Sequence, residues 1–359
     1  MPIAKIAALH VRAVRVPLPE PHNTASGTVA ESPLVLTDLT LDDGTVGHGL
    51  VFTYTPAALK PCAELIANLA PLVVGEPAAP LDVEQKLARR FRLLGPQGLV
   101  GIAIAAIDMA LWDAVARQRG LPLCVLLGAA PKPIPVYGAV GYDGERGSAA
   151  TAERWAKRGF TGVKAKIGYP TLAQDLAVVR AMRAAVGPQV AIMVDYNQSL
   201  TPTEAIERCR ALDGEGLNWI EEPTLAHDYA GLAAVARAAT TPIQAGENWW
   251  GTLDLQHALD AQASDYLMPD AMKISGVTGW LRASALAQPR GLRVSSHLWP
   301  ELSAHLLAAT PNAHWLEYAD WWNPILAAPL ALHGGTAVAG DAPGSGVAWN
   351  EDAVARYLF

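Results

Sequence analysis

Residues 161–168, TGVKAKIG, begin a stretch in which short apolar runs repeatedly end in ionisable residues. The later runs are VAIMVDYNQ (190–198), LNWIEEP (217–223), TPIQAGEN (241–248), DYLMPDAMKISG (265–276), LRVSSHL (292–298) and AHWLEY (313–318). Their spacing of about 25 residues fits one strand, one helix and two short loops. Repetition of this unit predicts a barrel of alternating strands and helices, whose chemistry lies at the C-terminal ends of the strands. The ionisable residues fall at those ends.

The segments around this repeat predict a second, smaller unit. Residues 1–16 alternate as a half-buried strand does, three prolines then break the pattern, and residues 20–32 predict a loop long enough to be functional. Residues 33–52 predict a hairpin around Asp43-Gly44, and helical spacing begins near residue 56. We therefore expect three parts: an α+β capping domain over 1–130 with a lid loop at 20–32, a (β/α)₇β barrel over 131–324, and a C-terminal segment, 325–359, that packs back on the capping domain.

The composition narrows the class of protein. The chain has 359 residues, of which 51% are hydrophobic and 17% charged, so it can bury a large core and is too apolar for disorder. The net charge of −7 and the lack of a basic run argue against a nucleic-acid or anionic-membrane surface. Three widely spaced cysteines and an N-terminus without a signal-peptide pattern predict a cytoplasmic protein with reduced thiols. The apolar run 99–116 contains Asp108 and Asp113, which favours a buried helix over a membrane span.

Three carboxylates follow successive predicted strands: Asp195, Glu221 and Glu247. At adjacent strand ends they would lie close together and repel one another unless a positive charge sits between them. Separate surface acids are the simpler explanation for one such residue, but not for three in consecutive repeats. A hard divalent cation with oxygen ligands satisfies the arrangement, and Mg²⁺ suits a site that leaves positions open for water and substrate.

Two lysines, Lys164 and Lys166, are spaced i, i+2 on the second predicted barrel strand, so both side chains point to one side. Two neighbouring ammonium groups lower the pKa of at least one of them. A lysine with a lowered pKa can act as a general base near neutral pH. The alternative is a solvated strand end that carries two ordinary lysines.

Asp270 and His297 end consecutive strands and predict a carboxylate–imidazole pair in which the carboxylate selects the tautomer of the ring. This pair would face the lysines across the barrel. Bases on opposite sides of one carbon can remove a proton from either face, as racemisation requires. Glu317, if protonated, would donate a hydrogen bond to a substrate oxygen. Asn197 would orient a ligand or a lysine.

Several of these motifs resemble those of the enolase superfamily and, within it, the mandelate racemase subgroup. The matching runs are KAKIGYP (164–170), VDYNQSL (194–200), IEEPT (220–224), GEN (246–248), MPDAMKISGVTGW (268–280), SSH (295–297) and SAHLLAATP (303–311). The similarity covers nearly the whole chain. It implies a modified (β/α)₇β barrel, capped by an N-terminal α+β domain that supplies a lid over the site.

The resemblance also implies roles for the strand-end residues. It implies Mg²⁺, with Mn²⁺ as a substitute, on the three carboxylates, and proton transfer by a lysine and a histidine–aspartate pair to and from an enediolate. The implied catalytic residues are Lys166, His297, Asp270, Glu317 and Lys164. The substrate-binding residues that we predict are Lys164, Asn197, Glu317, His22 and Tyr54. The implied metal ligands are Asp195, Glu221 and Glu247.

The sequence departs from the subgroup's pattern where the substrate pocket would be. His22 and Ser26 replace a more aliphatic lid surface, Ala139 follows Tyr137 and Gly138 without the expected polar groups, and Ala319 is small. These departures affect substrate specificity and leave the α-proton chemistry intact.

Three functions are consistent with these residues. The first is a Mg²⁺-dependent racemase of a small 2-hydroxy carboxylate, mandelate or an aromatic analogue, and it rests on the two opposed bases. The second is an acid-sugar dehydratase with the same proton abstraction, which would need a polar pocket. The third is a metal-stabilised scaffold without catalysis, which the complete set of polar groups argues against. In each case we expect a homo-oligomer.

Overall fold

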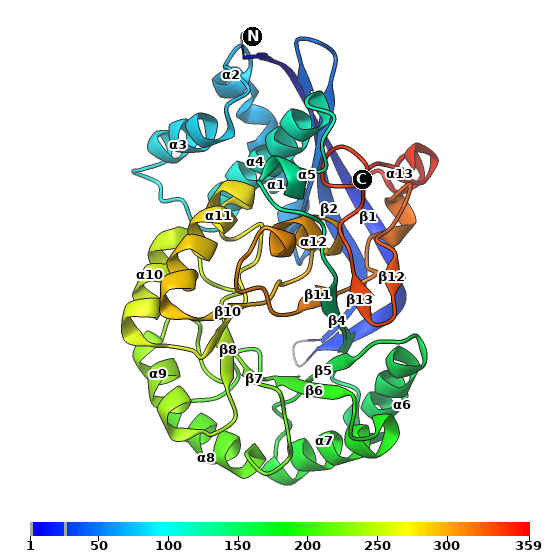
Figure 1. Cartoon of the computed structure of the whole chain (residues 1–359), viewed down its shortest axis with the longest axis vertical. Coiled ribbons are helices and arrows are strands. Elements are labelled where there is room, and N and C mark those ends of the chain that lie inside the picture. The colour runs from blue at the N-terminus through cyan, green and yellow to red at the C-terminus, as the bar shows by residue number, and fades with distance from the viewer. Residues whose placement is uncertain (1–2, 25–26) are drawn as a thin grey trace.

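The computed structural model describes residues 3–24 and 27–359 (Figure 1). A three-stranded antiparallel sheet begins the chain, in the order β1 (Ile6–Thr24), β2 (Gly27–Leu41), β3 (Val46–Phe52). The turn after β2 contains Asp43 and Gly44, as the sequence predicts, and Gly44 has the positive φ of 87° that favours glycine. The sheet packs against helices to form the capping domain.

In the segment 20–32, which we predicted as a loop, the described residues 20–24 and 27–32 are strand residues at the end of a long β-hairpin instead. β1 continues past its three prolines because it is the outer strand of the sheet, where a missing N–H costs no ladder bond. The pairing shifts register between Pro17 and His22, and then resumes with His22 opposite Val29. The hairpin therefore extends to the barrel, where Asn23 accepts a backbone hydrogen bond from Tyr142 at 2.8 Å. Ser26 lies outside the described residues.

The helices of the capping domain surround one central helix. They are η1 (Pro56–Ala58), α1 (Leu59–Asn68), α2 (Ala70–Val73), α3 (Pro80–Arg90), α4 (Leu99–Gln118) and α5 (Leu123–Leu126). α4 is long and apolar enough to cross a membrane, but 83% of its most apolar 18-residue stretch is buried inside the protein. Its two aspartates are satisfied internally: Asp108 accepts hydrogen bonds from the backbone and hydroxyl of Thr278. Asp113 accepts from the backbone of His48 and of Ser345. α4 is a core helix that joins the two domains.

Eight parallel strands form the barrel predicted by the repeat. They are β4 (Ile134–Val140), β5 (Gly162–Lys166), β6 (Ala191–Asp195), β7 (Ile220–Glu221), β8 (Ile243–Ala245), β9 (Tyr266–Leu267), β10 (Arg293–Val294) and β11 (Leu316–Tyr318). Strands β4 to β10 pair in sequence order, and β11 pairs with β4 to close the barrel. The fold is a modified (β/α)₇β barrel with an N-terminal α+β capping domain.

Seven α-helices connect the barrel strands on the outside (Figure 1). They are α6 (Gly144–Lys157), α7 (Leu172–Val186), α8 (Pro202–Leu212), α9 (Tyr229–Ala238), α10 (Gly251–Ala261), α11 (Gly276–Ala287) and α12 (Pro300–Ala308), with a 3-10 turn, η2 (Gln288–Arg290), after α11. α8 begins as its sequence predicts, because Thr201 and Glu204 form a reciprocal capping box around Pro202.

The C-terminal segment contacts both the barrel and the capping domain. It contains η3 (Asn323–Ile325), β12 (Leu332–His333), β13 (Thr336–Ala337) and α13 (Glu351–Tyr357). β13 pairs antiparallel with β4 of the barrel. Trp349 donates to Asp38 at 2.6 Å, and Arg12 binds Glu351 at 2.5 Å, so the segment also lies on the capping sheet.

Candidate active site

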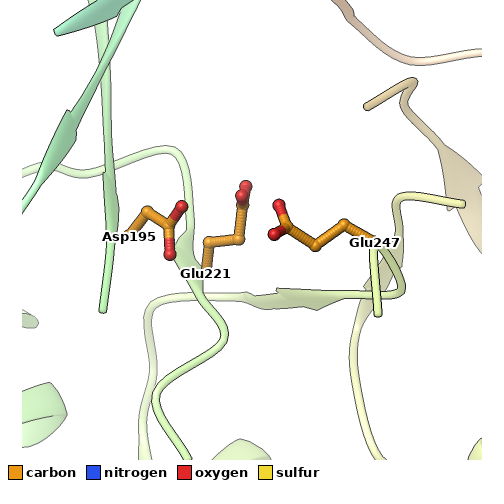
Figure 2. A group of neighbouring side chains, drawn as sticks. All are labelled: Asp195, Glu221 and Glu247. Carbon is orange, nitrogen blue, oxygen red and sulfur yellow. The ribbon is translucent and has the colours of Figure 1, made fainter. Parts of the chain in front are cut away.

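Three carboxylates converge at the C-terminal ends of adjacent strands (Figure 2). Asp195 ends β6, Glu221 ends β7, and Glu247 follows β8 by two residues. Their nearest ligand atoms all lie within 4.8 Å of one another, and all three side chains are buried. The parallel register places Asp195 beside Glu221, which explains why residues 26 positions apart in the chain meet here. A divalent cation can be held between three such oxygens.

The surroundings of the triad test whether a metal fits. Glu221 accepts hydrogen bonds from Trp219 at 3.0 Å and Gln244 at 3.1 Å, and Asn197 donates its backbone and side-chain N–H groups to Asp195. Burial raises the pKa of Glu221 to about 8, although the positive charge of Lys164 opposes the rise. Oε2 of Glu247 is buried, lies 3.4 Å from Nε2 of His297 and makes no hydrogen bond among the described residues. Oriented carboxylates with an unsatisfied buried oxygen fit Mg²⁺.

The two lysines of β5 point into the barrel mouth, as their spacing predicts. Nζ of Lys164 forms ion pairs with Glu221 and, at 2.8 Å, with Glu317. Nζ of Lys166 lies 2.5 Å from Asp195. Below them, Tyr137 and Trp219 fill the barrel interior, and the ring of Tyr137 lies 5.5 Å from Nζ of Lys164.

The pKa values of the lysines differ from our prediction. We predicted that two neighbouring ammonium groups would lower the pKa of at least one of them. Burial does lower the pKa of Lys166, but Asp195 and the other carboxylates raise it more, and the pKa lies above its ordinary value. The same balance, with Glu221 and Glu317 as the main opposing charges, raises the pKa of Lys164. The prediction considered the two lysines alone and left out the acids around them.

His297 and Asp270 form the predicted pair. Nδ1 of His297 lies 2.6 Å from Oδ2 of Asp270, while Oδ1 of Asp270 accepts the backbone N–H groups of Met272 and Lys273. Nε2 of His297 points to the triad, 3.4 Å from Glu247. Burial lowers the pKa of His297, but Glu247 and Asp270 outweigh it, so the pKa is raised.

Glu317 is in place, but its charge state differs from our prediction. Oε1 lies 2.8 Å from Lys164, and Oε2 accepts the backbone N–H of Leu298 at 3.0 Å. Burial raises the pKa of Glu317, but Lys164 and His297 lower it by more, so the pKa falls to about 2. We had considered a protonated acid at this position, but the adjacent cations favour the ionised carboxylate.

Two capping-domain residues reach this mouth. His22, near the hairpin end, is buried with its ring 5.2 Å from that of Trp321. Burial and the charge of Lys166 lower the pKa of His22 to about 4. Tyr54 follows β3 with a strained φ of 58°, and Nζ of Lys273 lies 4.7 Å from its ring centre. Both residues are positioned to contact a ligand from above.

Sequence reasoning missed a polar network behind the triad. Strand alternation would point Glu222 away from Glu221, but β7 ends at Glu221 and Glu222 takes a φ of 39°, so the alternation does not apply. The amide of Asn248 donates to both carboxylate oxygens of Glu222, at 2.9 and 2.8 Å. Lys273 donates to the other end of Asn248 at 2.6 Å. The only signal in the sequence was the position of these residues next to predicted site residues.

This geometry defines a class of protein: a capped (β/α)₇β barrel with an acidic triad, two lysines and a histidine–aspartate pair at the strand ends. Family comparisons agree. Residues 6–128 match the mandelate racemase/muconate lactonizing enzyme N-terminal domain, and residues 147–353 match the enolase C-terminal domain-like family. The chain belongs to the mandelate racemase/muconate lactonizing enzyme group of the enolase superfamily.

Relatives within this family carry out different reactions. A crystal structure of an enolase from Bradyrhizobium, complexed with magnesium and mandelic acid, has a TM-score of 0.97 and 42% identity, and covers 100% of this chain and 99% of its own. The L-talarate/galactarate dehydratase of Salmonella typhimurium is 32% identical over 90% of this chain and 82% of its own. The L-talarate dehydratase from Polaromonas sp. JS666, complexed with Mg and L-glucarate, has a TM-score of 0.91 and 30% identity, with coverage of 99% and 98%.

Proposed function

We propose that this protein is a Mg²⁺-dependent enzyme that removes and returns the α-proton of a 2-hydroxy carboxylate, and so racemises it. One observation carries the proposal. Lys166 contacts Asp195 at one end of the triad, and Nε2 of His297 lies beside Glu247 at the other end. A substrate bound over the triad would have one base on each side of its α-carbon. A homo-oligomer and a cytoplasmic location stay predictions.

Asp195, Glu221 and Glu247 would hold the Mg²⁺, which would supply positive charge for the negative charge that develops on the substrate carboxylate. Lys164 would bind one oxygen of that carboxylate. Glu317, on the strand next to that of His297, would hold the ammonium group of Lys164 in place beside that carboxylate. Lys166 would take the proton from one face and His297 from the other, and Asp270 would keep the ring proton on Nδ1 so that Nε2 stays free.

A second candidate is an acid-sugar dehydratase. One observation favours it: a cavity of about 720 Å³ beside the barrel mouth is lined by both charged and aromatic side chains. The two dehydratases above act on sugar diacids, and a dehydratase would use the same proton abstraction. The production of a 2-keto-3-deoxy acid from an aldonate or aldarate would identify this reaction.

Proton exchange from separate enantiomers tests the proposal. With Mg²⁺ in D₂O, the wild-type protein should exchange the α-proton of both (R)- and (S)-mandelate, or of another 2-hydroxy acid, as followed by proton NMR and polarimetry. Lys166→Ala should stop exchange from one enantiomer and His297→Asn from the other. Loss of a general base costs on the order of 10²- to 10⁴-fold in rate.

The matched control is Lys157→Ala, which removes an exposed lysine of α6 whose salt bridge is to Glu153. It should leave both exchange rates unchanged. If both base variants lost both activities equally, or if no 2-hydroxy acid exchanged, the two-base reaction would be wrong.

A further inference from the structure

A large cavity extends away from the reaction centre along α6. Its volume is about 720 Å³, within the range of small-molecule sites. It runs between the end of the β1–β2 hairpin, helix α6 and the loop after β11, and its wall includes His22, Trp321 and Arg158. None of the triad, the two lysines or His297 lines it. The cavity is therefore a separate space beside the reaction centre.

Two alanines connect the cavity with the reacting groups. Ala139 pairs in register with Lys164 across β4 and β5, so its side chain points to the same side of the barrel. Ala319 follows Glu317 by two positions and also lines the cavity. Both side chains are single methyl groups, so they take up little space between the cavity and the reaction centre. A substrate held by Lys164 and Glu317 could extend past them, beyond the ends of strands β4 and β11, which pair with each other.

Arg158 is held in a defined position at the far end. Its guanidinium carbon lies 4.3 Å from the ring centre of Trp155 and 5.6 Å from that of Phe160. The guanidinium forms an ion pair with Asp320 at 3.7 Å, a separation longer than that of a direct hydrogen bond. Arg154, one turn earlier, is in contrast bound to Glu20 at 2.6 Å. The side chain of Arg158 is half exposed, and its guanidinium has N–H groups left for a ligand.

The charges of the lining identify what would bind. Two guanidiniums and three carboxylates line the cavity: Arg154, Arg158, Glu20, Asp143 and Asp320. A second carboxylate on the substrate would meet an excess of negative charge. A hydroxyl group both donates and accepts, so it matches a wall that alternates donors and acceptors. Trp321 and the two alanines offer apolar contact to carbon atoms between the hydroxyls and the reaction centre.

We propose that this cavity is a distal subsite for a hydroxyl-bearing end of the substrate, and that Arg158 determines specificity there. The inference rests on the proposed function, since the other end of the substrate must be the 2-hydroxy carboxylate. The hydroxyls belong either to a sugar-acid chain or to an aromatic ring.

The test measures binding and α-proton exchange separately. Gluconate, 4-hydroxymandelate and unsubstituted mandelate are titrated into the Mg²⁺-loaded protein by calorimetry, and exchange is followed by proton NMR in D₂O. Arg158→Met keeps an unbranched stem over Trp155 and removes the donors. It should weaken at least one hydroxylated ligand about tenfold, which corresponds to ~1.4 kcal/mol, and leave mandelate unchanged. Asp320→Asn is a second variant with the same expected direction, and Arg180→Met, on α7 outside the cavity, is the control.

Each outcome decides the proposal. Weaker binding of gluconate alone identifies a sugar-acid chain, and weaker binding of 4-hydroxymandelate alone identifies a ring hydroxyl. Either result supports the subsite. Three results would overturn the proposal. All three ligands could weaken equally, neither hydroxylated ligand could weaken in Arg158→Met and Asp320→Asn, or no ligand could bind at all. Binding that depends on Arg158 without any α-proton exchange would contradict the proposed reaction and leave the subsite standing.

Discussion

Asp270→Asn should convert the two-base site into a one-base site. Oδ1 of Asp270 accepts the backbone N–H groups of Met272 at 2.6 Å and Lys273 at 3.0 Å, while Oδ2 faces only Nδ1 of His297, at 2.6 Å. An asparagine can keep Oδ1 on the two backbone groups. Its amide NH₂ then replaces Oδ2 and donates to Nδ1, so the ring proton must move to Nε2. Nε2, the atom that faces the triad, can no longer accept a proton.

The magnitude follows from the role of a general base. Proton transfer from the His297 side should slow by on the order of 10²- to 10⁴-fold, while exchange through Lys166 should change by less than about threefold. The backbone bonds at Oδ1 are kept, so the free energy of unfolding should fall by only about 1–2 kcal/mol. The assay is proton NMR of α-proton loss in D₂O, with each enantiomer incubated alone, beside urea unfolding.

Asp213→Asn is the matched control, because this aspartate also accepts two backbone N–H groups, from Thr240 and Thr241, but lies away from the barrel mouth. It should leave both rates unchanged. Equal losses from both enantiomers in Asp270→Asn, or no loss from either, would refute the assignment of His297 as a base on one face.

Two further predictions concern stability. Mg²⁺ at 100 times its Kd should stabilise the fold by ~2.7 kcal/mol and raise the Tm by several degrees. Glu247→Gln should abolish this rise in Tm, measured in a thermal melt. A rise that persists in the variant would place the metal elsewhere. Burial raises the pKa of Asp108 to about 7. The folded state therefore keeps a proton that the unfolded chain loses near pH 4, so the free energy of unfolding falls as pH rises from about 4 to about 7. Asp108→Asn should remove this loss, of which about 3 kcal/mol at most falls between pH 5 and pH 8, from the difference between urea unfolding at those two pH values; an unchanged difference would show that Asp108 is ionised throughout.

Much of the fold and of the candidate site was predictable because it depends on local periodicity. A strand–helix unit of about 25 residues is repeated along the chain, and a parallel barrel brings the ends of all such strands to one face. The positions of Asp195, Glu221 and Glu247 therefore followed from their places after three apolar runs. The spacing of Lys164 and Lys166 likewise required both side chains to point the same way.

Local patterns failed where the backbone departs from a regular strand. Prolines after residue 16 predicted the end of β1, but the strand lies at the sheet edge and tolerates them. Glu222 was placed by strand alternation, but its φ of 39° turns the carboxylate back towards Asn248. Neither an edge position nor a positive φ at a glutamate can be read from neighbouring residues.

The sequence by itself therefore determined the barrel, the capping unit and the identity of the groups at the strand ends, because each depends on spacing along the chain. Only the tertiary structure decided the charge states and the shape of the pocket. The pKa of Glu317 depends on how close Lys164 and His297 approach it, and Lys273 meets Tyr54 only because the domains pack together. The cavity along α6 exists because the β1–β2 hairpin, α6 and the loop after β11 meet there, and such contacts between distant segments leave no periodic signal in the sequence.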